Sequence, residues 1–267
     1  MEQVKRTGVI GLGAMGLQMA KHMVAKGFDV AGNDLDAGAM QRAKDLGVRT
    51  VGAADVARHA EVAIVMVATD AQVEDAVAGL LQNLSRGSVI CIASSVSPET
   101  CKRLAAQAAT KGVGVLDTPV VLGQEAANNG RLTIYVGGDE PSFARARPVL
   151  EAFGANVLHL GDVGSGQIAK TINNMLLWSC MAANLEALTL AKKLGADIPR
   201  LVTALGQGSG ANWSLSRWGK STGKWAVKDM DVALKLAKAA SVPTPLGGLL
   251  EQLVKDINQD RMKALLS

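Results

Sequence analysis

The chain has 267 residues, of which 48% are hydrophobic and 19% charged, a balance that indicates a folded globular protein long enough for two domains. A net charge of +4 with only 3% aromatic residues argues against nucleic acid as a partner, because the sequence offers no stacking surface. Three widely spaced cysteines without a CxxC or Cys/His cluster argue against a disulfide framework and a metal site. No apolar run reaches the ~20 residues that cross a bilayer, and the first strand follows too early for a signal peptide, so we expect no membrane partner and a cytoplasmic location.

The first elements predict a dinucleotide-binding unit. An apolar strand at Thr7–Ile10 runs into a glycine-rich turn and a helix that ends near Lys26, and a second strand at Asp29–Asn33 ends beside Asp34. Strand, GxGxxG, helix, strand and acid is the order in which a Rossmann fold binds dinucleotides. The residues expected at the cofactor are Gly11, Leu12, Gly13, Ala14, Met15, Gly16, Asn33 and Asp34.

Each part of this motif has a physical task. Gly11 allows the tight turn, Gly13 lets the backbone approach a pyrophosphate, and Gly16 lets helix pack on strand. The helix N-terminus offers amide groups to the phosphates. Asp34 is the natural acceptor for a ribose 2′-hydroxyl and would repel a 2′-phosphate, so NAD is favoured over NADP, although Asn33-Asp34 is also ordinary turn chemistry.

Alternating strands and helices continue to about residue 160 and predict a parallel sheet covered on both faces. Ala68 is the last residue of the buried strand Val62–Ala68, and Ser95 closely follows the buried strand Ser88–Ala93. Open α/β sheets bind ligands at the carboxyl ends of their strands, so we expect Ala68 at the cofactor and Ser95 at cofactor or substrate. The further predicted elements are Val48–Thr50, Ala53–His59, Asp70–Gln82, Gly114–Asp117, Leu132–Val136, Pro141–Phe153 and Asn156–Leu160.

A long helix at Gly164–Leu194 then begins a second domain. We place the boundary near residue 162, which gives a Rossmann-type domain at 1–162 and a helical domain at 163–267. The predicted fold class is α/β: a doubly wound, mainly parallel sheet domain followed by an all-α domain built on the long helix. Lys170 and Asn174, four residues apart, share one face near the start of this helix.

Four sequence blocks carry a family resemblance. They are GLGAMGLQMAKHM at 11–23, SSVSPET at 94–100, GSGQIAKTINNM at 164–175 and KDMDVAL at 228–234. In this order they resemble the cofactor loop, the Ser-Thr-x-x-Pro segment, the GxGxxxKxxNN catalytic signature and the late Lys-Asp block of the β-hydroxyacid dehydrogenase superfamily. That superfamily includes 3-hydroxyisobutyrate dehydrogenase and tartronate semialdehyde reductase.

The resemblance implies an oxidoreductase that transfers hydride between NAD(H) and a 3-hydroxy acid or its semialdehyde. It implies that Lys170 is the general acid/base, that Asn174 binds the small-molecule carboxylic acid substrate, and that Lys228 lies near nicotinamide and substrate with Asp229 in support. It also implies a homo-oligomer, a homodimer or homotetramer, formed through the helical domain.

The residues around Lys170 agree with that role. A lysine in the second turn of a largely apolar helix is expected to be partly desolvated, and the positive helix N-terminus acts in the same direction, so both lower its pKa. Such a lysine takes a proton from a hydroxyl as hydride leaves the carbon. A lysine that extends its stem along an apolar helix without catalytic role is the alternative interpretation.

Two departures from the family pattern concern the substrate. Where the family carries Asp-x-Pro-Val-Ser-Gly-Gly, this chain has DTPVVLG at 117–123, so Val121 replaces the serine and Leu122 a glycine, ahead of Gly123. Val121 cannot donate a hydrogen bond, which weakens the expected carboxylate anchor and favours a bulkier or less polar group beside C2 of the substrate. The segment between Gly206 and Lys228 is also short, either because a helix is abbreviated or because residues are absent near 218–226.

Two alternative functions stay open at this point. An imine reductase-like enzyme that uses NADPH would share the architecture, but Lys170 and Asp34 favour the dehydrogenase. A dinucleotide-binding module with a degenerate substrate site is the other alternative, which the change at Val121 and Leu122 keeps open.

Overall fold

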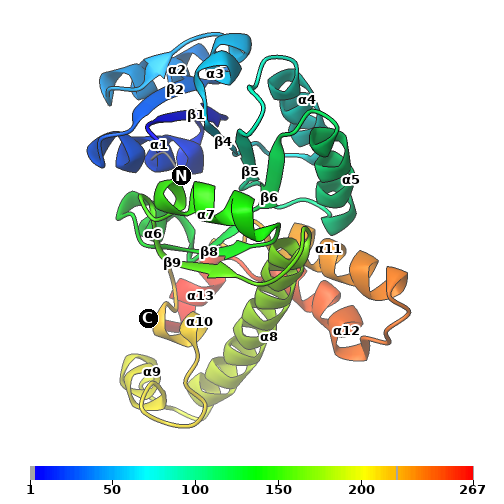
Figure 1. Ribbon diagram of the computed structural model, residues 1–267. Helices are drawn as coiled ribbons and strands as arrows, with labels where there is room; N and C mark the ends of the chain where they lie inside the picture. Colours follow the sequence, from blue (N-terminus) through cyan, green and yellow to red (C-terminus); the bar gives the residue numbers. More distant parts are fainter. Residues whose placement is uncertain (1–3, 221, 267) are drawn as a thin grey trace. The chain divides into compact units, whose positions relative to one another are not determined.

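The computed structural model describes residues 4–220 and 222–266 (Figure 1). The chain divides into two compact units, residues 1–170 and 171–267, and the division falls within helix α8 (Ser165–Lys193). The domain boundary that we predict near residue 162 lies in the loop ahead of this helix and stays a prediction.

The first unit is built on a six-stranded parallel sheet in the order β3-β2-β1-β4-β5-β6. This is the doubly wound arrangement that the sequence predicts, and it confirms the fold class of this part of the chain. The order reverses between β1 and β4, and sheets of this kind bind ligands at such a point, outside the carboxyl ends of the strands. The strands are β1 (Arg6–Ile10), β2 (Asp29–Asn33), β3 (Arg49–Thr50), β4 (Val62–Val65), β5 (Val89–Ile92) and β6 (Gly114–Asp117).

Helices cover both faces of this sheet, which explains why its central strands are continuously apolar. In β4 all four side chains are buried: Val62 and Ile64 enter one hydrophobic cluster, Ala63 and Val65 the other. The helices are α1 (Ala14–Ala25), α2 (Ala37–Asp45), α3 (Ala53–His59), α4 (Asp70–Leu81), α5 (Pro98–Ala109) and α7 (Glu140–Leu150). Our sequence analysis did not predict α2, which buries only Ala39 and Ala43.

A second, three-stranded sheet follows β6 in the same unit. Strand β7 (Val120–Val121) pairs antiparallel with β8 (Leu132–Val136), and β8 pairs parallel with β9 (Gly154–His159). From the sequence we expect the run Thr118–Gly123 and then a loop through Gly130, with no strand or helix in either part. That prediction is wrong, because the segment contains β7 and the short helix α6 (Gly123–Asn128).

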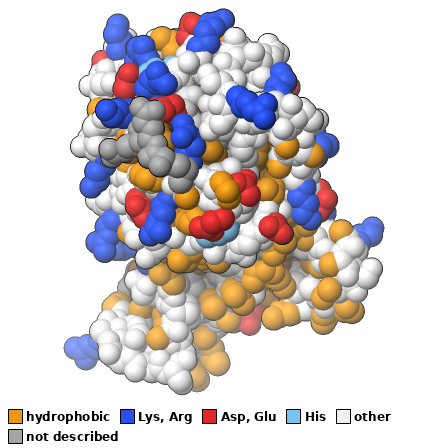
Figure 2. All heavy atoms as spheres, viewed as in Figure 1, with side chains coloured by type: hydrophobic (Ala, Val, Ile, Leu, Met, Phe, Trp, Pro, Cys, Tyr) orange, Lys and Arg blue, Asp and Glu red, His pale blue; other side chains and the backbone are white. Residues whose placement is uncertain are grey.

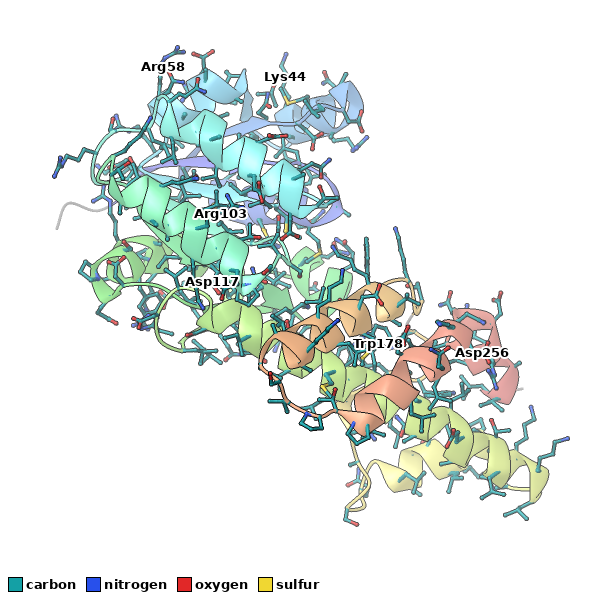
Figure 3. All side chains as sticks on the ribbon, turned by 90° about the vertical axis from the view of Figure 1, so that its right-hand side faces the viewer. Lys44, Arg58, Arg103, Asp117, Trp178 and Asp256 are labelled. Carbon is teal, nitrogen blue, oxygen red and sulfur yellow. The ribbon has the colours of Figure 1, made fainter. Side chains whose placement is uncertain are left out.

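Every element that the structure describes after α8 is helical, as the fold class predicts. These elements are α9 (Ile198–Leu205), α10 (Trp213–Ser216), α11 (Ala226–Ala239), α12 (Pro245–Leu253), the 3₁₀ turn η1 (Val254–Asp256) and α13 (Gln259–Leu266). They pack a separate core against α8, in which Trp178, labelled in Figure 3, donates a 2.9 Å hydrogen bond to Asp229. None of the described helices has the length and apolar character that a membrane crossing requires.

Candidate cofactor and active site

The glycine turn after β1 leaves open space at the position where a pyrophosphate is expected. Gly11 has φ +93°, and a Cβ there would lie 2.2 Å from the carbonyl oxygen of Met66. A Cβ on Gly16 would lie 1.9 Å from the carbonyl oxygen of Gly11, so the start of α1 packs directly on the turn. A Cβ on Gly13 would meet nothing within 4 Å. The turn is therefore tight on its inner side and unobstructed at Gly13.

The first turn of α1 has no side-chain cap. Its N-cap residue is Gly13, and Ala14 and Met15 are its first two residues. Uncapped amide groups at a helix N-terminus favour an anionic ligand such as a phosphate. Together with the open space at Gly13, this start of α1 fits the pyrophosphate of a dinucleotide.

Asp34 is held beside the glycine turn. Its Oδ2 accepts a 2.6 Å hydrogen bond from the amide of Leu12, and its Oδ1 accepts one of 2.9 Å from Asp36. Asn33 points elsewhere, because its side chain donates to the carbonyl oxygen of Val51 at 2.8 Å. A cavity of about 430 Å³ opens at Asp34 and is also lined by Leu35, Ala37, Met40, Gln41, Lys44 and Thr50. Asp34 thus offers an anionic group at the edge of a hollow large enough for part of a nucleotide.

Ser95 is exposed between two buried neighbours at the end of β5. The hydroxyl of Ser94 accepts a 2.8 Å hydrogen bond from the amide of Val67, and so links the ends of β4 and β5. On the other side, the amide of Val96 donates to Gln167 Oε1 at 3.3 Å. The backbone around Ser95 is therefore anchored while its own side chain faces outward. Ala68, after β4, is also exposed.

The start of α8 is capped by an acid from β6. Asp117 is fully buried, and its Oδ1 and Oδ2 accept hydrogen bonds of 2.7 Å from the amides of Gly164 and Gln167. Burial raises the pKa of Asp117 above its ordinary value, while these amide donors oppose the rise. A Cβ on Gly166 would lie 2.8 Å from Asp117 Oδ2, so only glycine lets the helix approach this closely.

The buried stripe of α8 changes from polar to apolar along the helix. Its residues are spaced alternately four and three positions apart, which places them all on one face of the helix. Its members are Gln167, Thr171 and Asn174, then Trp178, Met181, Leu185 and Leu188. Lys170 stands half-buried beside the polar part, one turn before Asn174, whose Oδ1 accepts a hydrogen bond from Asn173. Buried polar side chains need partners, so this polar start is typical of a site.

The loop that departs from the family pattern carries an unusual backbone. Leu122 adopts φ +80° and Gly123 φ +72°; a left-handed conformation costs a leucine about 1–2 kcal/mol. Val121 is buried, whereas 36% of Leu122 is exposed. Gln124 then donates a 3.0 Å hydrogen bond to the carbonyl oxygen of Ala14. The loop from Val121 to Gly123 is thereby tied to the glycine turn.

In the second unit, Lys228 lies in the first turn of α11 and is exposed. Its Nζ lies 5.9 Å from the ring centroid of Trp225. Asp229, which the resemblance assigns a supporting role, accepts the hydrogen bond of Trp178 and so joins α11 to α8. Apart from Asn174, Lys228 and the supporting Asp229, all the predicted site residues belong to the first unit.

Three residues that the sequence analysis did not single out connect the site. They are Asp117, Gln167 and Gln124, which bond respectively to the start of α8, the loop at Ser95 and the glycine turn. Asp117 could have been found as an acid ending a buried strand at a carboxyl edge. Gln167 and Gln124 carry no comparable local signal, because their partners lie far away in the sequence.

Comparison with known families covers nearly the whole chain. A model of the NAD-binding domain of 6-phosphogluconate dehydrogenase matches residues 6–161. A second model, described as NAD-binding of NADP-dependent 3-hydroxyisobutyrate dehydrogenase, matches residues 164–265.

Individual relatives agree with these matches. The 3-hydroxyisobutyrate dehydrogenase of Pseudomonas aeruginosa is 37% identical over 265 residues, which cover 91% of this chain and 89% of the relative. An NAD-dependent L-serine dehydrogenase of the same organism is 31% identical, with 94% of this chain and 92% of the relative covered. Among solved structures, Mycobacterium tuberculosis 3-hydroxyisobutyrate dehydrogenase with L-serine has a TM-score of 0.89 at 27% identity, with both chains fully covered.

Proposed function

This chain belongs to the β-hydroxyacid dehydrogenase superfamily, and we propose that it transfers hydride between NAD(H) and a 3-hydroxy acid or its semialdehyde, with Lys170 as general acid and base. The observation that carries this proposal is the polar start of α8. There Gln167 and Asn174 are buried and Lys170 is half-buried, on a helix whose buried face is apolar further along.

The first unit supplies the residues that would hold NAD. The glycine turn and the uncapped start of α1 suit the pyrophosphate, and Asp34 suits the hydroxyl groups of a ribose. Ala68 and Ser95 are exposed after β4 and β5 at the same edge of the sheet. NAD, when bound, supplies the acceptor for hydride, and the protein positions the substrate and moves the proton.

Lys170 carries the proton chemistry. As a neutral amine, its Nζ accepts the proton of the substrate 3-hydroxyl while the hydrogen on the same carbon leaves as hydride. In the reverse direction, the ammonium form returns that proton to the carbonyl oxygen. Asn174, one turn further along α8, orients the substrate through its amide. Lys228, in the first turn of α11, we assign to the nicotinamide side of the substrate.

The loop at Val121–Gly123 determines the substrate class in this proposal. Val121 provides no hydroxyl to a substrate carboxylate, and Leu122 adds an apolar side chain where a glycine would leave space. Among the relatives, one is named an L-serine dehydrogenase and one solved structure contains L-serine, a compound with a polar amino group at C2. For this chain we propose a 3-hydroxy acid with a larger or less polar group at C2.

A turnover screen with a lysine variant tests this function. Wild-type protein is offered NAD with 3-hydroxy acids that differ in the group at C2, and NADH formation is measured. Lys170→Ala should lower kcat at least about 100-fold, since general acid–base catalysis contributes roughly 10²–10⁴-fold, and should leave NAD affinity unchanged. Lys193→Ala, at the exposed end of the same helix, is the matched control. Unchanged turnover in Lys170→Ala would refute the acid–base assignment.

We also propose that two or four copies associate through the helical unit. Figure 2 shows hydrophobic side chains gathered over this unit on the face drawn. Exposed large hydrophobic residues of the unit include Leu176, Leu190, Leu194, Leu246 and Leu249. Exposed apolar patches of this kind are typical of protein interfaces. Light scattering of the purified protein measures the subunit number, and a monomer would contradict the proposal.

A cytoplasmic location completes the proposal. Cys91, Cys101 and Cys180 are free thiols, which suits a reducing compartment. Cell fractionation measures the location, and recovery of the protein outside the cytoplasm would contradict it.

A further inference from the structure

The side chain of Gln167 joins two parts of the candidate site. Its Nε2 donates a 2.8 Å hydrogen bond to the carbonyl oxygen of Ser94, and its Oε1 accepts one of 3.3 Å from the amide of Val96. One carboxamide therefore binds the backbone on both sides of Ser95. Only 1% of Gln167 is exposed, so water does not compete for these two bonds.

The backbone of Gln167 is fixed as well. Its amide donates to Asp117 Oδ2 at 2.7 Å, and the amide of Gly164 donates to the other oxygen of the same carboxylate. Both donors belong to the start of α8, whose first-turn amides have no partner within the helix. Asp117, labelled in Figure 3, thus caps α8 from a strand about fifty residues earlier.

The residue that makes these bonds lies one turn before Lys170. Lys170 follows Gln167 by three residues, and residues three apart are neighbours on a helix surface. A helix rises about 1.5 Å per residue. If the first turn of α8 slipped along the helix axis by one residue, Lys170 would therefore move by about 1.5 Å. Ser94 is in turn bonded to Val67 at the end of β4, where the exposed Ala68 follows.

We infer that Gln167 is a positioning residue, which sets the place of Lys170 relative to Ser95 and the strand ends of the first unit. This inference rests on the proposed function for the role of Lys170. Gln167 touches no reacting atom in it. The carboxamide acts by binding the loop at Ser94–Val96 to the turn of α8 that precedes the lysine.

The side-chain chemistry explains why a carboxamide is needed at this place. The loop presents one acceptor, the carbonyl of Ser94, and one donor, the amide of Val96, and a carboxamide matches both. A carboxylate could still accept from Val96 but would face the carbonyl oxygen of Ser94 with a second acceptor. A methionine of similar length would satisfy neither group.

Two variants of Gln167 test the inference. In Gln167→Met and Gln167→Glu, kcat should fall roughly 10-fold to 100-fold, because small misplacements of a catalytic group cost up to about that much. The affinity for NAD should change much less than kcat, because the side chain of Gln167 binds the loop at Ser94–Val96, whereas the glycine turn is held by Asp34. The matched control is Asp139→Ala, which removes the cap of α7, where Ser142 donates to Asp139 at 2.9 Å. That helix carries no proposed site residue, so this variant should lose stability and keep its kcat per folded molecule.

The Lys170→Ala background separates positioning from a general structural role. If Gln167 acts through the lysine, Gln167→Met should not lower the residual turnover of Lys170→Ala any further. An equal additional loss in that background, or a kcat equal to that of wild type in the single variants, would overturn the inference.

Hydrogen exchange of the cofactor-free protein provides a readout independent of activity. Amides of residues 164–172 should exchange faster in Gln167→Met than in wild type and should be unchanged in Asp139→Ala. Unchanged exchange in Gln167→Met would overturn the inference. If wild-type protein oxidises no hydroxy acid, the proposed function fails, and this measurement alone decides whether Gln167 fixes the start of α8.

Discussion

The amide of Leu12 donates a 2.6 Å hydrogen bond to Oδ2 of Asp34, twenty-two residues further along the chain. This bond fixes the carboxylate at the end of β2 against the glycine turn that follows β1. The acid that we propose discriminates between cofactors and the turn that we propose receives their phosphates are thereby held together.

Replacing Asp34 should weaken the preference for NAD. In Asp34→Ser we expect the affinity for NAD to fall about tenfold or more, because hydrogen bonds to a charged group are worth about 1.5–3 kcal/mol. Use of NADP should rise, since the repelling charge is gone and Lys44 lines the same cavity. Cofactor titrations measure both. Asp36→Ser removes a neighbouring carboxylate and its ion pair with Arg42, while serine can still cap α2, so this variant should leave the preference unchanged. Equal NAD affinity in Asp34→Ser and wild type would contradict the role of Asp34.

Alanine substitutions at two glycines of the turn should affect different properties, one cofactor binding and the other stability. Gly13→Ala should fold normally, because its Cβ meets nothing within 4 Å, yet should lose NAD affinity by at least about tenfold if the pyrophosphate lies there. Gly16→Ala should be destabilised, since its Cβ would lie 1.9 Å from the carbonyl oxygen of Gly11.

Gly79→Ala, in α4, is the control for these two variants. Its Cβ also meets nothing within 4 Å, and alanine should stabilise the helix by up to about 1 kcal/mol without any effect on NAD. Thermal melts and NAD titrations measure all three. A Gly13→Ala protein that binds NAD as tightly as wild type would show that the phosphates lie elsewhere.

Substitutions in the loop at Val121–Gly123 should change which class of substrate the enzyme prefers. Val121→Ser should raise kcat/KM for small 3-hydroxy acids with a polar C2 group, because it restores a hydroxyl donor. Leu122→Gly should also raise kcat/KM for these small substrates. Its free energy of unfolding should be higher than that of wild type by about 0.5–1 kcal/mol, because glycine adopts φ +80° without the strain that a leucine has there. Leu122→Ala keeps the strained backbone and should not gain that stability. Lower activity on small substrates in both Val121→Ser and Leu122→Gly would contradict the assignment.

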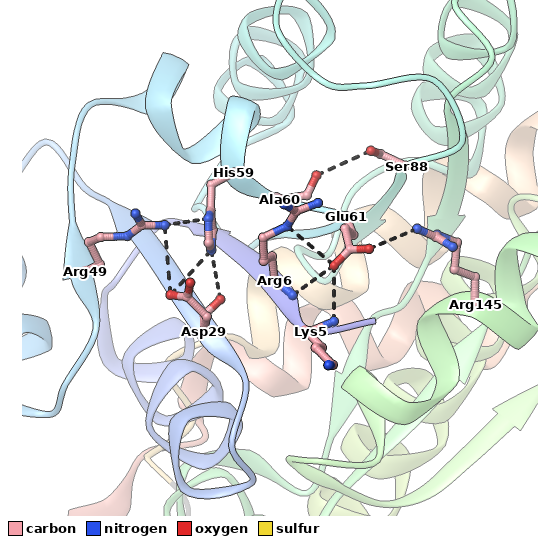
Figure 4. A network of polar contacts seen from close by, with 9 residues as sticks. All are labelled: Lys5, Arg6, Asp29, Arg49, His59, Ala60, Glu61, Ser88 and Arg145. Atoms are coloured by element: carbon pink, nitrogen blue, oxygen red, sulfur yellow. Dashed lines mark hydrogen bonds and ion pairs between the residues drawn. The ribbon is translucent and has the colours of Figure 1, made fainter. Parts of the chain in front are cut away.

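Glu61 should make the free energy of unfolding of the first unit depend on pH. Figure 4 shows its carboxylate between the amides of Lys5 and Arg6 and the guanidinium groups of Arg6 and Arg145. Partial burial acts to raise the pKa of Glu61, but the amides of Arg6 and Lys5 and the two guanidinium groups outweigh it and hold that pKa below its ordinary value.

A carboxylate with a lowered pKa stabilises the folded state above its ordinary pKa, and this stabilisation disappears as the pH falls through the folded-state pKa. Glu61→Gln should therefore cost about 1 kcal/mol near neutral pH, and the difference from wild type should vanish in acid. Denaturant unfolding at a series of pH values measures it. If the difference in unfolding free energy between Glu61→Gln and wild type does not change with pH, the lost stability comes from packing and not from the charge of Glu61.

Local patterns in the sequence predicted most of the sheet and the cofactor loop. The bounds of β2, β6 and β8 were predicted correctly, because short segments with apolar residues bounded by glycine and polar residues are a signal carried by neighbouring residues. Short or polar elements were missed for the same reason. Helix α2 buries only two alanines, and α6 begins after a leucine in a left-handed conformation that no propensity favours.

The sequence by itself determined the fold class, the family and the likeness of Gly11–Gly16 and Lys170 to family motifs, since these depend on residue spacing along the chain. Only the tertiary structure decided that β7, β8 and β9 form a separate sheet, and that Asp117 and Gln167 hold the start of α8. The partners in these bonds lie 50 and 73 residues apart. They meet because the order of strands in the sheet brings distant carboxyl ends to one edge, and no local pattern specifies that order.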